Sequence, residues 1–465
     1  MDLTNRRDLL KALLAGGACT LCSSGVSAAF FPSMRGPTPN NGTKRLLYIF
    51  LRGGNDGVNT VVPVGDSSYQ TMRRNIRVDQ TGLAIAGTSH AKAHPALAQL
   101  VGPGSPDAAG RIAWLHQVGN PLGTRSHFYE MDVHESLYVP PTQSTSALNP
   151  EGWVARLAGF QNWPGTVPSA GLASFFRAFH AKLEPGSTSK VLAEVRNVDA
   201  YDFTNPPLPE PSQSIAGRLE TLLGGHLAGT PYSGAAGDVA EFADFALQAI
   251  PQLQNVPTLP DPPTAGITSP SHLLFLTQIR DAMRLLAHVP DCRVAGVNFG
   301  GFDTHADQLE SQDALLTTLA TALRYVDDVS QNVGLVGPLF DDAMLTLVVS
   351  EFGRTARDNG PKDPAPIDPT VGTDHGIGNL AIAQGKKVQG GVHNCDPATW
   401  PDGHLAALAG TGGENAVPAL TDFRAIYSEI LREWFRVRPN QLHNVLLNLS
   451  DPVPPTLVEL DFLAP

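Results

Sequence analysis

Several short polar clusters in this chain carry side chains that could bind a cation or attack an ester. Asp56 lies in a glycine-rich turn, and Ser126 and His127 stand at the start of a helical pattern. Later clusters supply carboxylates, imidazoles and an arginine, at Asp303, His305, Asp307, Glu351, Arg354, Asp374 and His375. Oxygen and nitrogen ligands without thiolates suit Zn²⁺, Mn²⁺, Mg²⁺ or Ca²⁺, and the sequence does not choose among these ions.

Each cluster alone has an ordinary structural explanation. Asp56 fits a turn, Ser126 fits a helix N-cap, and a single His or Asp is often a satisfied hydrogen-bonding group. Ser126 would also profit from the helix dipole and free N–H groups if it attacked an anionic ester. Arg354 offers a planar fork suited to phosphate or sulfate. Because the clusters stand at successive ends of predicted strands, a shared metal site explains them better together.

Five continuous apolar segments predict the strands that would position these clusters. They are residues 45–51, 111–118, 293–299, 344–350 and 379–384. Continuous rather than alternating apolar character is typical of strands buried on both faces of a parallel sheet. Apolar residues at three- and four-residue spacing predict helices at 126–137, 272–287, 308–329 and 421–435. This alternation favours a doubly wound α/β fold with a mostly parallel central sheet, in which ligands gather beyond the carboxyl ends of the strands.

The chain organisation indicates one large domain with an insertion. We assign residues 1–28 to a signal peptide, 29–44 to a linker, 45–440 to the α/β domain and 441–465 to a C-terminal extension. Proline-rich connectors at 203–213 and 251–270 bracket a helical pattern near 239–250, which predicts an insertion or cap at about 160–270. The Pro- and Asp-rich stretch 359–373 is a long loop, of the kind that often carries function.

The N-terminus has the three zones of an export signal. A basic stretch with Arg6, Arg7 and Lys11 precedes an apolar run that reaches Leu21, and small residues follow up to a cleavage position after Ala28. Paired arginines just ahead of the apolar run are typical of twin-arginine signals, which direct folded proteins to their export machinery. A short amphipathic or buried helix is the alternative, but few polar residues after Lys11 could form its second face.

The charge and the cysteines limit the environment of the mature chain. The full chain has a formal net charge of −12, and removing residues 1–28, with three basic and two acidic residues, leaves −13. An acidic surface argues against a nucleic-acid partner, and no later segment is apolar enough to span a membrane. Cys292 and Cys395 remain after processing and could pair in an oxidising compartment. Cys19 and Cys22 could instead mark a lipoprotein, but a glycine stands where lipid attachment usually has an aliphatic residue.

The polar clusters, with their neighbours, resemble the signatures of a known family. The matching segments are Phe50–Gly57, Arg125–Phe128, Gly301–His305, Ser350–Thr355 and Asp374–Gly376. They are similar, in order and content, to those of a large bacterial family of twin-arginine-exported proteins of unknown function, which is grouped with the alkaline phosphatase-like superfamily. With the flanking strand and helix patterns, the resemblance covers the chain from residue 45 to about residue 435.

The superfamily resemblance implies a central sheet with helices on both sides, a divalent metal centre, and hydrolysis or transfer of phosphate or sulfate esters. Asp56 resembles the carboxylate ligand after the first strand, and Ser126 resembles the hydroxyl nucleophile at a helix start. Asp303 and His305 resemble a pair that supplies one metal. The superfamily commonly spaces that pair more widely, which leaves Asp307 as a competitor.

The later motifs depart from the superfamily pattern in ways that bear on the chemistry. Glu351 stands where an Asp-His pair is usual, and Phe352 replaces the histidine, so one ligand of a full two-zinc site is missing. His375 resembles the late histidine ligand, with Asp374 beside it as a second candidate. Ser126 lacks the Pro and Arg that follow the nucleophile in sulfatases, so a formylglycine sulfatase is not expected.

We therefore expect an exported, metal-dependent hydrolase of phosphate or sulfate esters, found in the periplasm or secreted. Its nucleophile would be Ser126, beside His127, with Arg354 steering the anion. The expected metal ligands are Asp56, Asp303, His305, Glu351, Asp374 and His375. The expected partners are the twin-arginine export machinery and a small anionic ester. The alternative is a non-catalytic binding or assembly protein of the cell envelope that has kept the fold and lost the chemistry.

Overall fold

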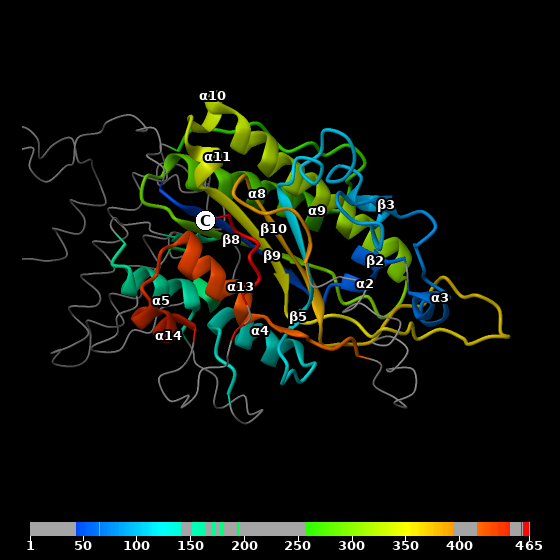
Figure 1. The fold of residues 1–465 in the computed structure, drawn as a ribbon. Helices are drawn as coiled ribbons and strands as arrows, with labels where there is room; N and C mark the ends of the chain where they lie inside the picture. The colour runs from blue at the N-terminus through cyan, green and yellow to red at the C-terminus, as the bar shows by residue number, and fades with distance from the viewer. Residues whose placement is uncertain are drawn as a thin grey trace, which may run out of the picture. The chain divides into compact units, whose positions relative to one another are not determined.

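The apolar segments predicted as strands form the centre of the fold in the computed structural model (Figure 1). They are β1 (Arg45–Arg52), β5 (Ile112–Gly119), β8 (Val294–Gly300), β9 (Met344–Ser350) and β10 (Asn379–Gln384). Nearly every residue in them is buried, as continuous apolar sequence requires. The structure describes residues 43–64, 66–140, 151–163, 169–172, 177–179, 193–194, 256–393, 416–446, 457 and 459–464, all within one unit of the chain.

These strands belong to a nine-stranded mixed sheet with the order β11-β5-β10-β9-β1-β8-β6-β7, in which β12 also pairs with β5. The shorter members are β6 (Ser169–Gly171), β7 (Ala193–Glu194), β11 (Gly391–His393) and β12 (Thr421–Asp422). Every strand pair is parallel except the two that involve β10. The predicted α/β class is therefore confirmed, with one reversed strand inside a sheet that is otherwise parallel.

The reversal of β10 determines which loops meet. The carboxyl ends of β1, β5, β8 and β9 lie at one edge of the sheet, and β10 begins at that same edge because it runs the other way. The segment that precedes β10 is thereby brought to the carboxyl edge, where in an all-parallel sheet it would lie at the opposite edge. The sequence pattern identified this strand but not its direction.

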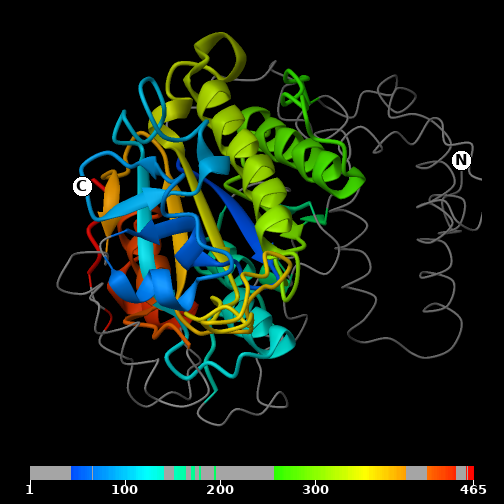
Figure 2. The same cartoon turned by 90° about the vertical axis from the view of Figure 1, so that its right-hand side faces the viewer.

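Helices cover both faces of the sheet (Figures 1 and 2). On one face lie α8 (Pro270–His288) and α9 (Gln308–Gln331), followed by the short α10 (Val333–Val336) and α11 (Phe340–Ala343). On the other lie α4 (His127–Ser136), α5 (Trp153–Phe160), α13 (Arg424–Glu429) and α14 (Pro439–Leu446). The helix predicted at 421–435 is split, since α13 continues as a π-helical turn over Ile430–Trp434.

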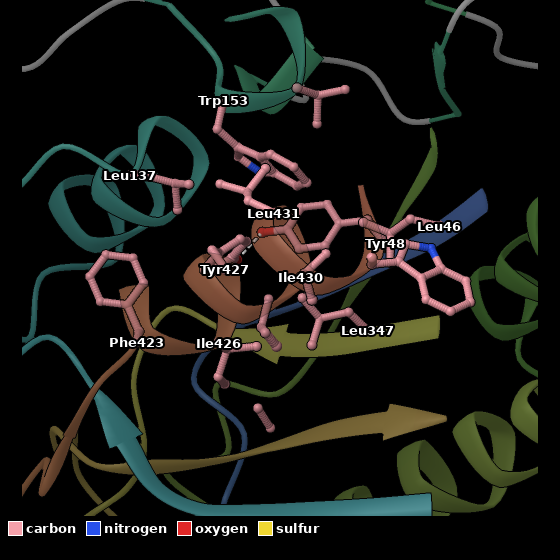
Figure 3. Close-up of a cluster of buried hydrophobic side chains, with 14 of the residues drawn as sticks. Leu46, Tyr48, Leu137, Trp153, Leu347, Phe423, Ile426, Tyr427, Ile430 and Leu431 are labelled. Atoms are coloured by element: carbon pink, nitrogen blue, oxygen red, sulfur yellow. Dashed lines mark hydrogen bonds between the residues drawn. The ribbon is translucent and has the colours of Figure 1, made fainter. Parts of the chain in front are cut away.

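A buried apolar cluster joins the second helix layer to the sheet (Figure 3). Tyr48 of β1 packs edge-on against Trp153 of α5, with ring centroids 5.6 Å apart. Its hydroxyl lies 2.8 Å from the hydroxyl of Tyr427 in α13, so one of the two buried phenols donates a hydrogen bond to the other. Such contacts fix α5 and α13 against β1 and hold this side of the sheet rigid.

A smaller antiparallel sheet follows β1 in the chain. It consists of β2 (Val61–Pro63), β4 (Ala91–Ala93) and β3 (Leu83–Ala84), in that spatial order. Two short helices, α2 (Gly57–Thr60) and α3 (Ser67–Met72), lie between β1 and β3 in the sequence. Within the described part of the chain, no helix has the length and apolar character needed to cross a membrane.

Several sequence expectations fall outside the described residues. The export signal 1–28 and most of the linker 29–44 lie there, as do the helical pattern near 239–250 and Cys395. Of the expected insertion at 160–270, short pieces and residues 256–270 are described. The extension expected from residue 441 begins inside α14, and its later residues Phe462 and Leu463 are buried in the apolar cluster.

Candidate metal centre

Three histidine rings and one carboxylate converge at the carboxyl edge of the sheet. His127 is the first residue of α4, Asp303 and His305 follow β8, and His375 precedes β10. The Nε2 atom of His375 lies 3.0 Å from Nε2 of His127 and 3.0 Å from Nε2 of His305. Asp303 Oδ1 lies 3.0 Å from Nε2 of His305 and 3.2 Å from Nε2 of His375, and Asp303 Oδ2 lies 3.5 Å from Nε2 of His127. We call these four residues the candidate metal centre.

The other ring nitrogen of each histidine faces a hydrogen-bond acceptor. Nδ1 of His127 lies 2.9 Å from Oε1 of Glu351, and Nδ1 of His305 lies 3.1 Å from Oδ1 of Asp374. Nδ1 of His375 lies 3.0 Å from the backbone carbonyl oxygen of Arg125. A carbonyl can only accept, and a carboxylate accepts when ionised, so these partners favour the tautomer with the proton on Nδ1. Each Nε2 then presents a lone pair to the centre.

Convergent lone pairs repel one another unless a cation lies among them. Ligands bonded at 2.0–2.1 Å to a tetrahedral zinc ion are about 3.3 Å apart, and those of an octahedral ion somewhat less. The ligand atoms of His127, Asp303 and His375 lie 3.0–3.5 Å from one another and form the group that could share one ion. His305 adjoins this group, with its Nε2 atom 3.0 Å from His375 and from Asp303. The donor set and its spacing therefore fit a single divalent ion, with the outer acceptors orienting the rings as they do in known metal sites.

The charges near the candidate metal centre are also unbalanced. Asp303, Glu351 and Asp374 contribute three carboxylates, while Arg354 contributes one guanidinium. With neutral imidazoles this leaves an excess of two negative charges, which one divalent cation would neutralise. Asp303, His305 and Asp374 are 48 %, 44 % and 66 % exposed in their side chains, so one side of the centre is open to solvent. An ion here could be reached by a substrate.

Arg354 holds the candidate metal centre together and is not placed to steer an anion. Its side chain is buried, and its guanidinium donates to Gly54 O at 2.8 Å, Phe302 O at 2.7 Å and Thr373 O at 3.2 Å, as well as to Gly53 O. It also donates to Oδ1 of Asp303 at 2.7 Å. These bonds join the loops after β1 and β8 to the segment before β10.

The pKa of Asp303 reflects this contact. Desolvation would raise it, but the hydrogen bond and positive charge of Arg354, with further contributions from His375 and His305, lower the pKa to about 2. Asp303 is therefore an anion over the physiological range. For His375, desolvation lowers the pKa despite the nearby carbonyl of Arg125, which favours the neutral ring that a metal requires.

Glu351 lies behind His127 and not among the converging atoms. It follows β9 directly, and its side chain is fully buried. Desolvation would raise its pKa, but hydrogen bonds from His127 and from Gly53 lower it. The same hydrogen bond raises the pKa of His127, ahead of the opposing desolvation. Glu351, which the sequence predicted as a metal ligand, therefore contacts the candidate ligand His127 and does not face the metal position itself.

Phe352 follows Glu351 and packs against two of the histidine rings. Its ring centroid is 4.8 Å from that of His127 and 4.7 Å from that of His375. It is buried, and a Cβ added at Gly54 would meet its ring at 2.5–2.6 Å. Gly53 is constrained in the same way, because a Cβ there would lie 2.3 Å from the backbone nitrogen of Asp303. Gly53 and Gly54 therefore make room for the Asp303 loop and the Phe352 ring.

Asp56 does not reach the candidate metal centre. Both of its carboxylate oxygens pair with the guanidinium of Arg73, and neither side chain is exposed. It also caps α2 by accepting from the backbone N–H groups of Val58 and Asn59, and accepts from the Gln308 amide. With its oxygens committed in this way, Asp56 is a structural residue, and the sequence expectation that it binds metal is not supported by its contacts. The ion pair with Arg73 had no signal in the sequence.

Ser126 lies beside the candidate metal centre by its position in the chain. It is the N-cap of α4 and is exposed, and its side chain makes no capping hydrogen bond. The residue before it, Arg125, has a left-handed φ of 61° and supplies the carbonyl that accepts from His375; the residue after it is His127. The hydroxyl is thus free to react and flanked by two residues that contact the centre.

The long loop 359–373 is anchored so that it delivers His375. Asp358 accepts from the backbone and side-chain amides of Asn75, both bonds being 2.8–2.9 Å long. At its other end, the N–H of Asp307 donates to Thr370 O at 2.7 Å. Asp307 itself precedes α9 with a left-handed φ of 49° and is not part of the metal-ligand cluster. Asp303, not Asp307, is the carboxylate that pairs with His305.

A separate cavity of about 400 Å³ lies away from this edge. Arg111, Arg324, Asp327, Asp328 and Gln331 are among its lining residues. Arg111 immediately precedes β5, so the cavity belongs to the amino edge of the sheet. The guanidinium of Arg111 is paired with Asp327 and Asp341, so Arg111 offers no unpaired charge to a ligand in this cavity.

One family model matches the chain, over residues 278–399, and its description is a protein of unknown function (DUF1501). The match includes Asp303, His305, Glu351 and His375 but not His127 or Ser126. No curated protein matches the chain.

Proposed function

We propose that this chain is an exported, metal-dependent hydrolase of phosphate or sulfate esters, built around one divalent ion. The proposal rests on one observation: the Nε2 atoms of His127 and His375 and the Asp303 carboxylate lie 3.0–3.5 Å apart, His305 adjoins them, and each Nδ1 faces an acceptor. If each ring carries its proton on Nδ1, no N–H is left to join the Nε2 atoms, whereas a purely hydrogen-bonded network would need a proton between each pair.

The donor set favours zinc. Mg²⁺ and Ca²⁺ prefer oxygen ligands, whereas imidazole suits Zn²⁺ and its transition-metal neighbours. A single ion is favoured because Phe352 packs against His127 and His375 and supplies no further ligand. Metal analysis should accordingly give one ion per chain.

When bound, the ion would act as a Lewis acid toward an ester oxygen and lower the pKa of a coordinated water. Ser126 is the candidate nucleophile, since its hydroxyl is exposed and adjoins His127. The free backbone N–H groups of the first turn of α4 and the dipole of this ten-residue helix would attract the anion. The start of α4 would therefore attract the anion in place of Arg354, whose guanidinium donates to backbone carbonyls and to Asp303.

The decisive experiment measures metal and turnover together. Zinc, manganese and iron would be quantified in protein purified from its own compartment, for the parent, His375→Ala and the surface control His90→Ala. We expect stoichiometric metal in the parent and control, and little in His375→Ala. Aryl phosphates, phosphodiesters and sulfates would then be offered to the parent and Ser126→Ala.

The outcomes separate the candidate functions. Metal-free parent protein without turnover would overturn the hydrolase proposal. Stoichiometric metal without turnover on any ester would favour the alternative, a binding or assembly protein of the cell envelope. If Ser126→Ala kept full activity, a metal-bound water would replace the serine as nucleophile.

The export part of the proposal has its own test. Arg6 and Arg7 precede an apolar run, and we propose that the twin-arginine machinery carries the chain to the periplasm or outside. Replacing both with Lys should retain the protein in the cytoplasm, as measured by fractionation. Unchanged export of that variant would contradict this route while leaving the metal proposal intact.

A further inference from the structure

Glu351 is a buried carboxylate with an unusual set of partners. Its Oε1 accepts from the backbone N–H of Gly53 at 2.7 Å and lies 2.9 Å from Nδ1 of His127, while Oε2 lies 3.0 Å from the hydroxyl of Ser350. Among the described residues, no Lys or Arg forms an ion pair with it. A buried anion normally needs a cationic partner. For Glu351 the cationic partner would be His127 together with a metal ion bound to the opposite nitrogen of that ring.

The position of Glu351 matches the outer part of a carboxylate–histidine–metal arrangement. Such a carboxylate fixes the proton on one ring nitrogen, orients the ring and makes the opposite nitrogen a stronger donor. His127 is the only one of the three rings whose Nδ1 faces a fully buried carboxylate, since Nδ1 of His305 faces the exposed Asp374 and Nδ1 of His375 faces a backbone carbonyl.

We propose that Glu351 is a positioning residue that holds His127 with its proton on Nδ1, so that the Nε2 lone pair faces the candidate metal centre and binds zinc tightly. This inference rests on the proposed function. It assigns Glu351 neither to the metal nor to the substrate, and it makes the buried charge a determinant of metal affinity.

Two substitutions separate the roles of Glu351. In Glu351→Gln, the amide oxygen can still accept from Gly53 and His127, and the amide nitrogen can donate to Ser350, so the hydrogen bonds survive and the charge is lost. In Glu351→Met, whose side chain has a similar volume, both the hydrogen bonds and the charge are lost. Asp107→Asn is the matched control, since Asp107 is another buried carboxylate that accepts from a ring N–H, that of Trp114, and from a backbone N–H.

The experiment has two readouts. Nitrogen-15 NMR of the metal-free protein at alkaline pH reports which ring nitrogen of His127 carries the proton, assigned by comparison with His127→Gln. Competition with a chelator reports the zinc dissociation constant. We expect the Nδ1–H form in the parent and in Glu351→Gln, and a mixture in Glu351→Met. Zinc binding should weaken about 10-fold in Glu351→Gln and about 100-fold in Glu351→Met, and stay unchanged in Asp107→Asn.

The results distinguish failure of this inference from failure of the proposed function. An Nε2–H form of His127 in the parent, which needs no variant to detect, would overturn the inference. So would a folded Glu351→Met that binds zinc as the parent does. If the parent binds no zinc at all, the proposed function fails, and the NMR readout alone then decides whether Glu351 sets the tautomer.

Discussion

Asp56 and Asp303 show how two aspartates at strand ends acquire different roles. Each comes within four residues of the end of a central strand, β1 or β8. Asp56 is paired on both oxygens with Arg73 and has no exposed surface. Asp303 is half exposed; its Oδ1 contacts Arg354, His305 and His375, and its Oδ2 faces His127. The difference lies in the partner that each fold position supplies.

Removing the charge of Asp56 should cost stability and leave the metal in place. Asp56→Asn breaks a fully buried ion pair, and we expect the free energy of unfolding to fall by about 3 to 5 kcal/mol. Asp79→Asn, which breaks the more exposed pair with Arg77, should cost less than about 1 kcal/mol. Urea titration measures both. Loss of zinc from the folded Asp56→Asn protein would return Asp56 to the list of ligands.

The elements of the sheet could be predicted from sequence because their signal is local. A continuous apolar run indicates that a strand is buried on both faces, and the predicted bounds of the five strands agree with the observed bounds to within one residue. The direction of β10 depends on its neighbours in the sheet, because a short apolar segment has the same pattern whether the strand runs parallel or antiparallel to them. The sequence therefore placed the candidate residues at the ends of these strands, whereas the reason that His375 reaches the carboxyl edge came only from the structure.

The roles of the candidate site residues could not be read from residue type. Residue type suggested that Glu351 could bind metal and Arg354 an anion, and both are compatible with sequence position. Burial and neighbours decide otherwise: Arg354 donates to four backbone carbonyls from distant loops, and Glu351 stands behind His127. A sequence pattern does not show that an arginine side chain will donate to backbone carbonyl groups of distant loops.

The loop after β1 tests how tightly the elements fit. Gly54 has φ +77°, and a side chain there would overlap Phe352, so Gly54→Ala should destabilise the protein by about 2 to 4 kcal/mol. Gly87 has the same φ of +77° with nothing within 4 Å, so Gly87→Ala isolates the backbone cost. In the Gly54→Ala background, Phe352→Leu should recover part of the loss. Equal losses of unfolding free energy in Gly54→Ala and Gly87→Ala would show that the Phe352 ring moves aside without an energetic penalty.

Strand β5 should make stability depend on pH. His116 is buried, and desolvation lowers its pKa to about 3. Its pKa in the unfolded chain is about 6.5, so between these values the unfolded chain binds a proton that the folded one does not. Stability should therefore fall as the pH drops below about 6.5, by up to about 1.4 kcal/mol per unit from this residue. His116→Gln should flatten the slope by that amount, measured by urea titration at several pH values, whereas His90→Gln should not.

At the scale of the whole molecule, the candidate metal centre joins segments that are far apart in the chain. His127 and Asp303 are separated by 176 positions, and His375 lies a further 72 beyond. Such a site cannot exist before the sheet has formed, so binding of the ion would be coupled to folding. A protein that folds before export could then acquire its metal in the cytoplasm; export of a metal-free chain that binds its ion only outside would contradict this.

Zinc should stabilise the folded chain in proportion to its affinity. At a free zinc concentration of about 100 times the dissociation constant, the gain is about 2.7 kcal/mol, which corresponds to a few degrees in the midpoint of thermal unfolding. Chelation should lower the midpoint and zinc should restore it. His375→Ala should show neither change, and a midpoint insensitive to chelation in the parent would contradict the coupling.

The reversed strand β10 also bears on how the chain length could vary. Its antiparallel pairing with β5 and β9, interrupted by an irregularity at Asn379–Ala381, fixes where the strand begins. His375 is only four positions earlier, so one residue added or removed in between would shift the ring by about 3 Å, as far as the distance between adjacent donors. The loop 359–371 is anchored at its two ends, near Asp358 and Thr370, so a change of length between these anchors need not move His375. We expect insertions and deletions to be tolerated in that loop and excluded between His375 and Asn379, whatever residues occupy the positions.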